Sequence, residues 1–384
     1  MPFPMRLPLF AVIVALALSV LTPSPLVHAQ GVGQAEQAQD HRFRIVEVAR
    51  GFDRPWSLAF LPDGRMLVTE RGGNLRWINA DGILMPRPIS GVPDVVDNGQ
   101  GGLLDVIPHP RFADNSLIYF SYAYGNLMGA HTAVARGRLD GGRLTDQEVL
   151  LEAGPLTRGG RHFGSRLAFG VDGHLYITIG DRGRRDESQS LASHNGTVVR
   201  LTEDGAVPTD NPFVGQTGTL PEVYSYGHRN AQGMAVQPGS GRIWLHEHGP
   251  RGGDEVNIVS AGVNYGWPII TYGEEYRGGS IGIGTSAEGM AQPVAYWTPS
   301  IAPSGMAFYE GSAFPAWQGD LFVGALVGQH LSRLDVEGQT VVGEEKLLEG
   351  LFARIRDVRT GPDGFLYLLT DASPGQLLRL EPAQ

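Results

Sequence analysis

The chain contains no cysteine among its 384 residues. An exported protein without cysteine has no disulfides, so its stability must come from core burial and from any metal ion it binds. Long helical patterns are also scarce: from Phe43 onward, short β-rich runs bounded by Gly, Pro, Asp and Asn dominate. This second absence favours a fold built from strands.

An excess of basic residues is missing as well. The formal net charge is −10, whereas a nucleic-acid-binding domain shows a basic face, so we expect no nucleic-acid partner. The 54 glycines and 26 prolines follow no Gly-X-Y period, which excludes collagen and favours turns. With 42% hydrophobic residues the chain can fold, and all-β rings of this length often form a single domain.

Only one long apolar run is present, and it lies at the start of the chain. Arg6 precedes the apolar residues Leu7–Leu21, and the small residue Ala29 ends the segment. We predict a signal peptide over residues 1–29, cleaved near Ala29–Gln30. A membrane anchor is the alternative, but a spanning helix needs roughly 20 apolar residues. No second such run follows, so the sequence predicts a periplasmic or secreted protein without a membrane span.

The remaining chain divides into a short leader and one domain. Residues 30–41 are mostly polar and small and are expected to form a flexible leader, and residues 42–384 are expected to form a single domain. Within this domain a turn containing Asp or Gly recurs, each time followed by a strand of aliphatic and aromatic residues. It occurs at residues 62–70, 113–122, 171–181, 239–249, 318–326 and 362–371.

These six units predict an all-β, six-bladed β-propeller with four-stranded antiparallel blades. A single four-stranded sheet cannot bury both of its faces, whereas blades packed around an axis bury them mutually. Residues 43–48 are expected to pair with the last blade and close the ring. The Gly-rich segment 271–293 lacks the repeat and is interpreted as an insertion between blades. A β-sandwich is the alternative, but six similar units along the whole domain favour a ring with long loops on one face.

Several generic motifs carry little weight. The G-x-S-x-G match at 278–282 is not followed by a helical pattern, and no G-x-G-x-x-G opens a helix after a strand. Asn195-Gly196-Thr197 matches a glycosylation sequon, which chance explains at least as well. His246 and His248 would share one face of a strand, but no third histidine has a spacing that completes a zinc site.

His162 is the main candidate for chemistry. It lies in a Gly-rich loop just before a predicted strand, and a histidine there can act as a general base because its ordinary pKa is near neutrality. An isolated loop histidine is more often simply solvated. Other polar residues also flank predicted strands, and one end of a propeller would bring them together: Gln100, Arg229, Asn230, Gly249, Pro250, Trp297, Thr298, Arg354 and Arg356.

Each of these residues also has a structural interpretation. The two arginines Arg354 and Arg356 could tie blades together, Gly249-Pro250 could be only a tight turn, and Asp254 and Glu255 could be solvated acids. Their joint presence on one chain favours a site.

Eight blocks of sequence resemble a known family. They run in order as RPWSLAFLPDGRMLVTER, QGGLLD, RHFGSRLAF, YSYGHRNAQGMA, EHGPRGGDEVN, NYGWP, IAPSGMAFY and RIRDVRTGPDG. The chain resembles the soluble pyrroloquinoline quinone (PQQ)-dependent glucose/sorbosone dehydrogenases, and especially their exported bacterial aldose sugar dehydrogenase members, over about residues 45–381.

The resemblance implies a six-bladed propeller that binds PQQ and Ca²⁺ and oxidises an aldose at C1 to the lactone. His162 matches the general base, which takes the anomeric proton as hydride moves to the quinone. Arg229 and Asn230 match cofactor contacts, where a guanidinium stabilises the negative charge that develops on the quinone oxygen. An external acceptor would then take the electrons.

The other matching residues complete the expected site. Gln100 matches a residue over the cofactor, and the carbonyls of Gly249 and Pro250 match calcium ligands, since calcium prefers oxygen. Both Arg354 and Arg356 match contacts to the cofactor carboxylates. The last two candidates, Trp297 and Thr298, match a stretch that lines the same pocket.

The chain departs from the family pattern at two points. Arg161 stands where well-known members have an Asp before the base, and the stretch around Val327 and Gln329 lacks a cofactor-contacting lysine. A carbohydrate-binding propeller with a decayed quinone site is therefore an open alternative, and a calcium-dependent lactonase a further one. The sequence carries no signature for the sugar, the electron acceptor or the oligomeric state.

Overall fold

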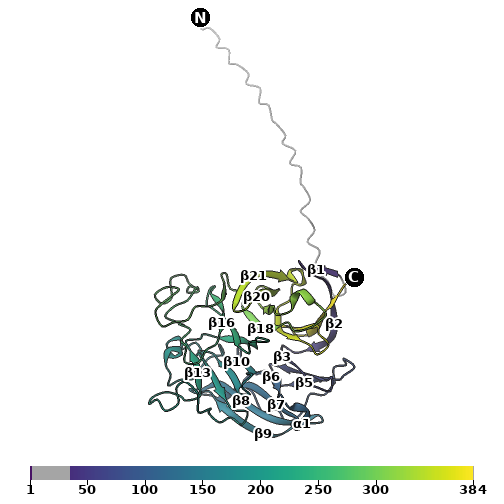
Figure 1. The fold of residues 1–384 in the computed structure, drawn as a ribbon, viewed down its shortest axis with the longest axis horizontal. Helices are drawn as coiled ribbons and strands as arrows, with labels where there is room; N and C mark the ends of the chain where they lie inside the picture. Colours follow the sequence, from purple (N-terminus) through teal and green to yellow (C-terminus); the bar gives the residue numbers. More distant parts are fainter. Residues whose placement is uncertain (2–34, 384) are drawn as a thin grey trace.

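Six antiparallel sheets form a ring in the computed structural model, which describes Met1 and residues 35–383 (Figure 1). The predicted six-bladed β-propeller is confirmed. Apart from Met1, the predicted signal peptide lies outside the described residues. No helix in the described part of the chain is long and apolar enough to cross a membrane.

Each blade starts with an inner strand, and the later strands lie progressively further from the axis. The inner strands are β3 (Pro55–Phe60), β6 (Leu103–Pro108), β10 (Gly164–Phe169), β14 (Ala231–Val236), β18 (Pro303–Phe308) and β22 (Ile355–Thr360). The second strands are β4 (Met66–Glu70), β7 (Leu117–Asn126), β11 (Leu175–Ile179), β15 (Ile243–Glu247), β19 (Leu321–Ala325) and β23 (Leu366–Thr370). The outer strands are β5 (Leu75–Ile78), β8 (Gly129–Asp140), β9 (Arg143–Glu152), β12 (Thr197–Leu201), β13 (Val223–Tyr226), β16 (Asp254–Ile258), β17 (Ala295–Trp297), β20 (Leu331–Glu337) and β21 (Thr340–Leu347). Short helices are α1 (Phe112–Asn115) and the 3₁₀ turns η1 (Arg185–Gln189), η2 (Pro315–Trp317) and η3 (Glu349–Leu351).

The six sequence repeats coincide with the six second strands. Each of these strands is buried on both sides because it lies between two neighbouring blades. In β11, Leu175 and Ile177 pack towards the preceding blade, whereas Tyr176 packs with Met234 and Leu245 of the next blade. The period-two alternation therefore serves two separate cores.

Blade closure joins the two ends of the domain. Strand β2 (Arg42–Phe52) pairs antiparallel with β24 (Gly375–Pro382), with Phe43 opposite Pro382, which confirms the predicted closure. Strand β1 (Ala35–Gln37) extends this sheet to five strands, and Ala38 is buried in its core. Part of the segment expected to be a flexible leader thus contacts the last blade. The β3–β5 blade has three strands, and Ile89 adds an isolated bridge to Leu75.

The position expected for segment 271–293 is wrong. It lies within the fourth blade, in the long connection between β16 and β17, and not between blades. The fourth strand of this blade, β17, has only three residues, which is too short to show a strand pattern in the sequence.

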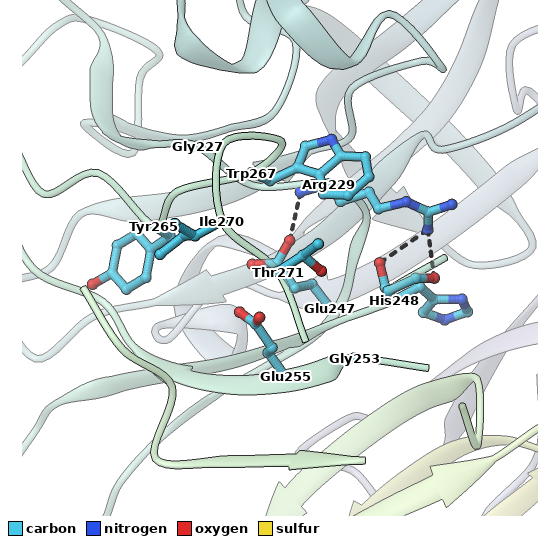
Figure 2. Close-up of a pocket in the computed structure, with 11 residues that line it drawn as sticks. Gly227, Arg229, Glu247, His248, Gly253, Glu255, Tyr265, Trp267, Ile270 and Thr271 are labelled. Carbon is cyan, nitrogen blue, oxygen red and sulfur yellow. Dashed lines mark hydrogen bonds between the residues drawn. The ribbon is translucent and has the colours of Figure 1, made fainter. Parts of the chain in front are cut away.

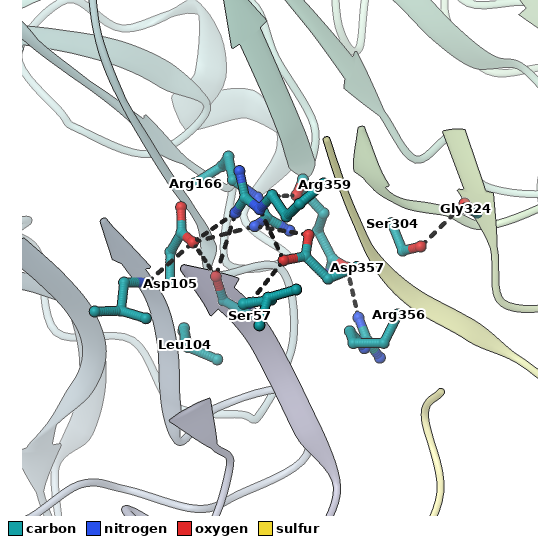
Figure 3. Close-up of polar contacts among 12 residues, drawn as sticks. Ser57, Leu104, Asp105, Arg166, Ser304, Gly324, Arg356, Asp357 and Arg359 are labelled. Atoms are coloured by element: carbon teal, nitrogen blue, oxygen red, sulfur yellow. Dashed lines mark hydrogen bonds and ion pairs between the residues drawn. The ribbon is translucent and has the colours of Figure 1, made fainter. Parts of the chain in front are cut away.

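A buried ionic cluster joins the inner strands at the axis of the ring (Figure 3). Arg166 Nη1 lies 3.1 Å from a carboxylate oxygen of both Asp105 and Asp357. Arg359 contacts the same two acids at 3.1 and 3.0 Å. Ser57 Oγ donates to Asp105 at 2.6 Å. This axial cluster of five residues links the first, second, third and sixth blades.

The loops before the first strands and after the second strands meet at one end of the ring, here called the upper face. All antiparallel blades share this geometry, so residues at equivalent positions in different blades converge there. Every predicted site residue except Arg356 belongs to, or directly adjoins, one of these loops, and Arg356 is the second residue of β22.

Candidate active site

His162 lies on the upper face, immediately before β10, and is held by a chain of hydrogen bonds. Its Nδ1 lies 2.6 Å from Asp181 Oδ1, and Asp181 follows the end of β11. The other carboxylate oxygen, Oδ2, accepts from Trp267 Nε1 at 2.8 Å. The carboxylate therefore orients the imidazole, and an indole from the connection between β16 and β17 orients the carboxylate.

The electrostatics of this pair suit a base. Burial lowers the pKa of His162 below its ordinary value, and the Arg229 charge adds to this effect, while the Asp181 hydrogen bond opposes it. Burial acts to raise the pKa of Asp181, but the hydrogen bond from His162 holds it below its ordinary value. An ionised Asp181 accepts a hydrogen bond from the Nδ1–H of a neutral His162, which leaves the Nε2 lone pair free to accept a proton.

Gln100 contacts the base loop directly. Its Oε1 accepts the backbone N–H of His162 at 2.6 Å. Its own N–H donates to Gly160 O at 2.5 Å. The loop before β6 thus lies against the loop before β10, so the structure confirms that Gln100 and His162 are neighbours.

Arg229 and Asn230 occupy the loop before β14. Arg229 Nη1 donates to the carbonyls of His248 and Gly249 at 2.9 and 2.8 Å (Figure 2), and its guanidinium carbon lies 5.3 Å from the Trp267 ring centre. Asn230 is fully buried, and its Oδ1 accepts from Gly164 N at 3.2 Å. Both Arg229 Nε and Asn230 Nδ2 are buried donors without a protein partner.

A small pocket beside Arg229 contains two carboxylates, Glu247 and Glu255 (Figure 2). Burial raises the pKa of Glu255, and the neighbouring charge of Glu247 raises it further. Such oxygen donors suit a hard cation. Among the described residues, no group of three or more His, Cys, Asp or Glu side chains is arranged to hold a metal ion.

The interpretation of Asp254 as a solvated acid is wrong. This residue is fully buried and accepts hydrogen bonds from Gly249 N and Ile301 N, both at 2.8 Å. It therefore fixes the turn that carries Gly249 and Pro250. A cavity of about 550 Å³ opens beside this turn, and Thr298 also lines it.

Trp297 is not brought to this group. Its indole packs in the core between the fourth and fifth blades and donates to Glu344 at 2.9 Å. Strand alternation sends the side chain of Trp297 inward, and only its neighbour Thr298 reaches the cavity.

Arg354 and Arg356 meet at one acid. Their guanidinium groups lie 2.9 and 3.2 Å from Asp371 Oδ2. Burial lowers the pKa of Arg356, and the charge of Asp371 opposes this effect. The Nε of Arg356 is buried without a protein partner. Val327 and Gln329 belong to the stretch without the lysine of the family pattern, and Val327 is exposed and lines the larger cavity.

Three residues of this site carried no assigned role in the sequence. Asp181 contacts His162, and both Trp267 and Glu247 contact Arg229, although these three residues lie elsewhere in the chain. Asp181 and Glu247 stand at the ends of the second strands β11 and β15. An acid at the end of a second strand is a candidate site residue, because the second strands end at the upper face. This pattern could have identified Asp181 and Glu247 from the sequence.

Known proteins share the sequence and the fold of this chain. The sequence model described as glucose/sorbosone dehydrogenase matches residues 52–379. The chain belongs to the glucose/sorbosone dehydrogenase family. It is therefore an enzyme of the sugar dehydrogenase type.

Individual relatives extend the likeness over nearly the whole chain. Aldose sugar dehydrogenase YliI of Escherichia coli is 48% identical over 337 residues, which cover 86% of this chain and 90% of the relative. The apo-form crystal structure of the soluble aldose sugar dehydrogenase from E. coli is similar with a TM-score of 0.86 and 46% identity, covering 89% of this chain and all of that one. The PQQ-bound aldose sugar dehydrogenase of Streptomyces coelicolor is similar with a TM-score of 0.73 and 31% identity, covering 90% of this chain and 99% of that one.

Proposed function

We propose that this enzyme oxidises an aldose at C1 to the lactone with PQQ as cofactor and His162 as general base. An external acceptor then takes the electrons. The observation that carries the proposal is the Trp267–Asp181–His162 hydrogen-bond chain, which presents a neutral imidazole at the upper face. The N-terminal segment supports export to the periplasm or the medium.

Several buried donors of the candidate site fit an anionic, oxygen-rich cofactor. Arg229 Nε, Asn230 Nδ2 and Arg356 Nε are buried donors without protein partners, and such groups are normally satisfied. Arg229 and Asn230 would contact PQQ near its quinone oxygens, and Arg354 and Arg356 would contact its carboxylates. When bound, PQQ supplies a two-electron acceptor for the hydride.

Calcium would be held by the carbonyls of Gly249 and Pro250. Gly249 O already accepts a hydrogen bond from Arg229, but a carbonyl has two lone pairs and can serve a cation as well. The carboxylates of Glu247 and Glu255 lie in the adjoining pocket and supply the negative charge that a calcium site uses.

The side chains of the protein would accept one proton from the sugar and stabilise the negative charge that develops on the cofactor. His162 Nε2 takes the proton of the C1 hydroxyl, and the ionised Asp181 stabilises the imidazolium that results. Arg229 stabilises negative charge that develops beside it, because its guanidinium is fixed in advance by two carbonyls and the Trp267 ring.

Reconstitution tests the proposal. We expect the apo-protein to bind PQQ in the presence of calcium and to reduce a dye when aldoses are added. Dye reduction measured over a panel of aldoses gives the activity, and titration of the cofactor gives its affinity. Absence of PQQ binding would refute the proposal. Binding without turnover would instead favour a carbohydrate-binding propeller with a decayed site.

Replacing Asp181 by asparagine is expected to lower turnover about tenfold at pH 7, because the amide cannot stabilise the imidazolium. The wild-type kcat/KM should fall only below pH 6.5, since burial lowers the pKa of His162. Asp181 raises that pKa, so its loss should move this decline to still lower pH. A pH–rate profile measures both effects. The exposed neighbour Asp186→Asn is the control, and a decline that moves to higher pH would contradict the assignment.

A further inference from the structure

Arg71 follows strand β4 and contacts the loop that carries Gln100. Its Nε donates to Gly101 O at 3.2 Å, and its Nη2 donates to Gly99 O. The backbone carbonyl of Arg71 also accepts from Leu103 N at 3.1 Å. One guanidinium thus binds the carbonyls of Gly99 and Gly101, the residues on either side of Gln100.

This loop is in backbone contact with the base loop. A Cβ on Gly160 would lie 2.6 Å from Asn98 O, and a Cβ on Gly99 would overlap Gly160 O. Only glycine permits such an approach. Gln100 adds two hydrogen bonds across the contact, to the N–H of His162 and to Gly160 O. A displacement of the Gln100 loop therefore reaches His162.

The backbone of His162 needs such support. Its φ is 55°, in the left-handed region. A residue with a side chain loses about 1–2 kcal/mol there, so neighbouring contacts must hold the conformation. The Gln100 Oε1 bond is made to the N–H of this same residue.

We propose that Arg71 is a positioning residue for the catalytic base. It fixes the loop around Gln100, and Gln100 in turn fixes the backbone of His162, so three successive blades contribute to the placement of one imidazole. The inference rests on the proposed function insofar as His162 is the base. Its structural part concerns the protein alone and can be measured without a cofactor.

Arg54 provides a matched control. Both Arg54 and Arg71 reach Asp97, at 2.6 and 3.5 Å. Arg54 is the more exposed, with 39% of its side chain accessible against 14% for Arg71. Only Arg71 donates to the carbonyls beside Gln100. Loss of the Asp97 ion pair is therefore separable from loss of the contact to the loop.

We call the contacts from Arg71 through the Gln100 loop to His162 the relay. Hydrogen exchange of the apo-protein tests it, measured by mass spectrometry of peptides that cover residues 159–163. Exchange of the His162 amide requires its bond to Gln100 to open. We expect Arg71→Met to speed exchange in this segment about tenfold and Arg71→Lys to give an intermediate rate, because lysine keeps a donor but not the fork. Arg54→Met should exchange at the wild-type rate.

Turnover supplies a second measurement. After reconstitution, Arg71→Met is expected to lower kcat about tenfold, because small displacements of a reacting group reduce rates steeply. The PQQ affinity and the sugar KM should stay within about threefold of the wild type, and Arg54→Met should keep its activity.

Several results would overturn the relay. Unchanged exchange in Arg71→Met is one, and equal acceleration in Arg54→Met is another. If Arg71→Met does not fold, Arg71→Lys decides, and wild-type exchange together with wild-type turnover would count against the proposal. Failure of the proposed function appears differently, as absent turnover in the reconstituted wild type, and leaves the exchange comparison intact.

Discussion

His162→Ala is expected to lower turnover by about 10²–10⁴-fold, the usual contribution of a general base. Alanine removes the only imidazole that lies against Asp181 in the described structure, so no group there can take the hydroxyl proton as readily. PQQ affinity should remain near the wild-type value, because the arginines that would contact the cofactor come from other blades. Steady-state dye reduction and a fluorescence titration of PQQ measure the two quantities.

His174→Ala is the matched control for this substitution. His174 belongs to the turn between β10 and β11, at the opposite end of the same blade, and contacts Asp172 and Arg200. It should keep wild-type turnover. Wild-type turnover in His162→Ala would instead show that another group is the base.

Asp105→Ala is expected to destabilise the protein by about 3–5 kcal/mol. Asp105 is completely buried and contacts both Arg166 and Arg359, so its removal leaves two cations in the axial cluster with one carboxylate, that of Asp357. Denaturant unfolding, monitored by tryptophan fluorescence, gives the change in free energy of unfolding.

An exposed ion pair provides the control. Asp63→Ala breaks the contact to Arg65, in which 48% of the acid is accessible, and should change stability by less than about 1 kcal/mol. Equal losses in the two variants would contradict the idea that burial makes the axial cluster critical.

The sequence predicted the ring because its second strands are the most regular part of the fold. In β11, alternate residues face alternate neighbouring blades, so both sides of the strand are apolar and the turn before it is sharp. Outer strands show no comparable pattern. Strand β17 has three residues, and so the long segment before it was assigned to the wrong place in the fold.

The sequence predicted which loops form the site but not which side chains contact one another there. His162 and Gln100 were expected to meet, and they do. The partner of the base could not be deduced, since Asp181 lies 19 residues away and Trp267 a further 86 beyond it. Trp297 was predicted to line the pocket but packs in the core. Adjacent residues of a strand face opposite sides, and β17 is too short for the sequence to show which of Trp297 and Thr298 faces the cavity.

The pairing of β2 with β24 has a consequence for protein engineering. Because Phe43 stands opposite Pro382, the two ends of the domain are adjacent in one sheet. A short linker can therefore join them, and new termini can be opened elsewhere, for example in the Gly239–Gly241 turn between β14 and β15. Such a circular permutant moves the seam of the ring to another blade and leaves the upper face unchanged. The position of the chain ends decides which blade contains strands from both ends of the domain, whereas the arrangement of the catalytic loops follows from the order of the blades around the ring.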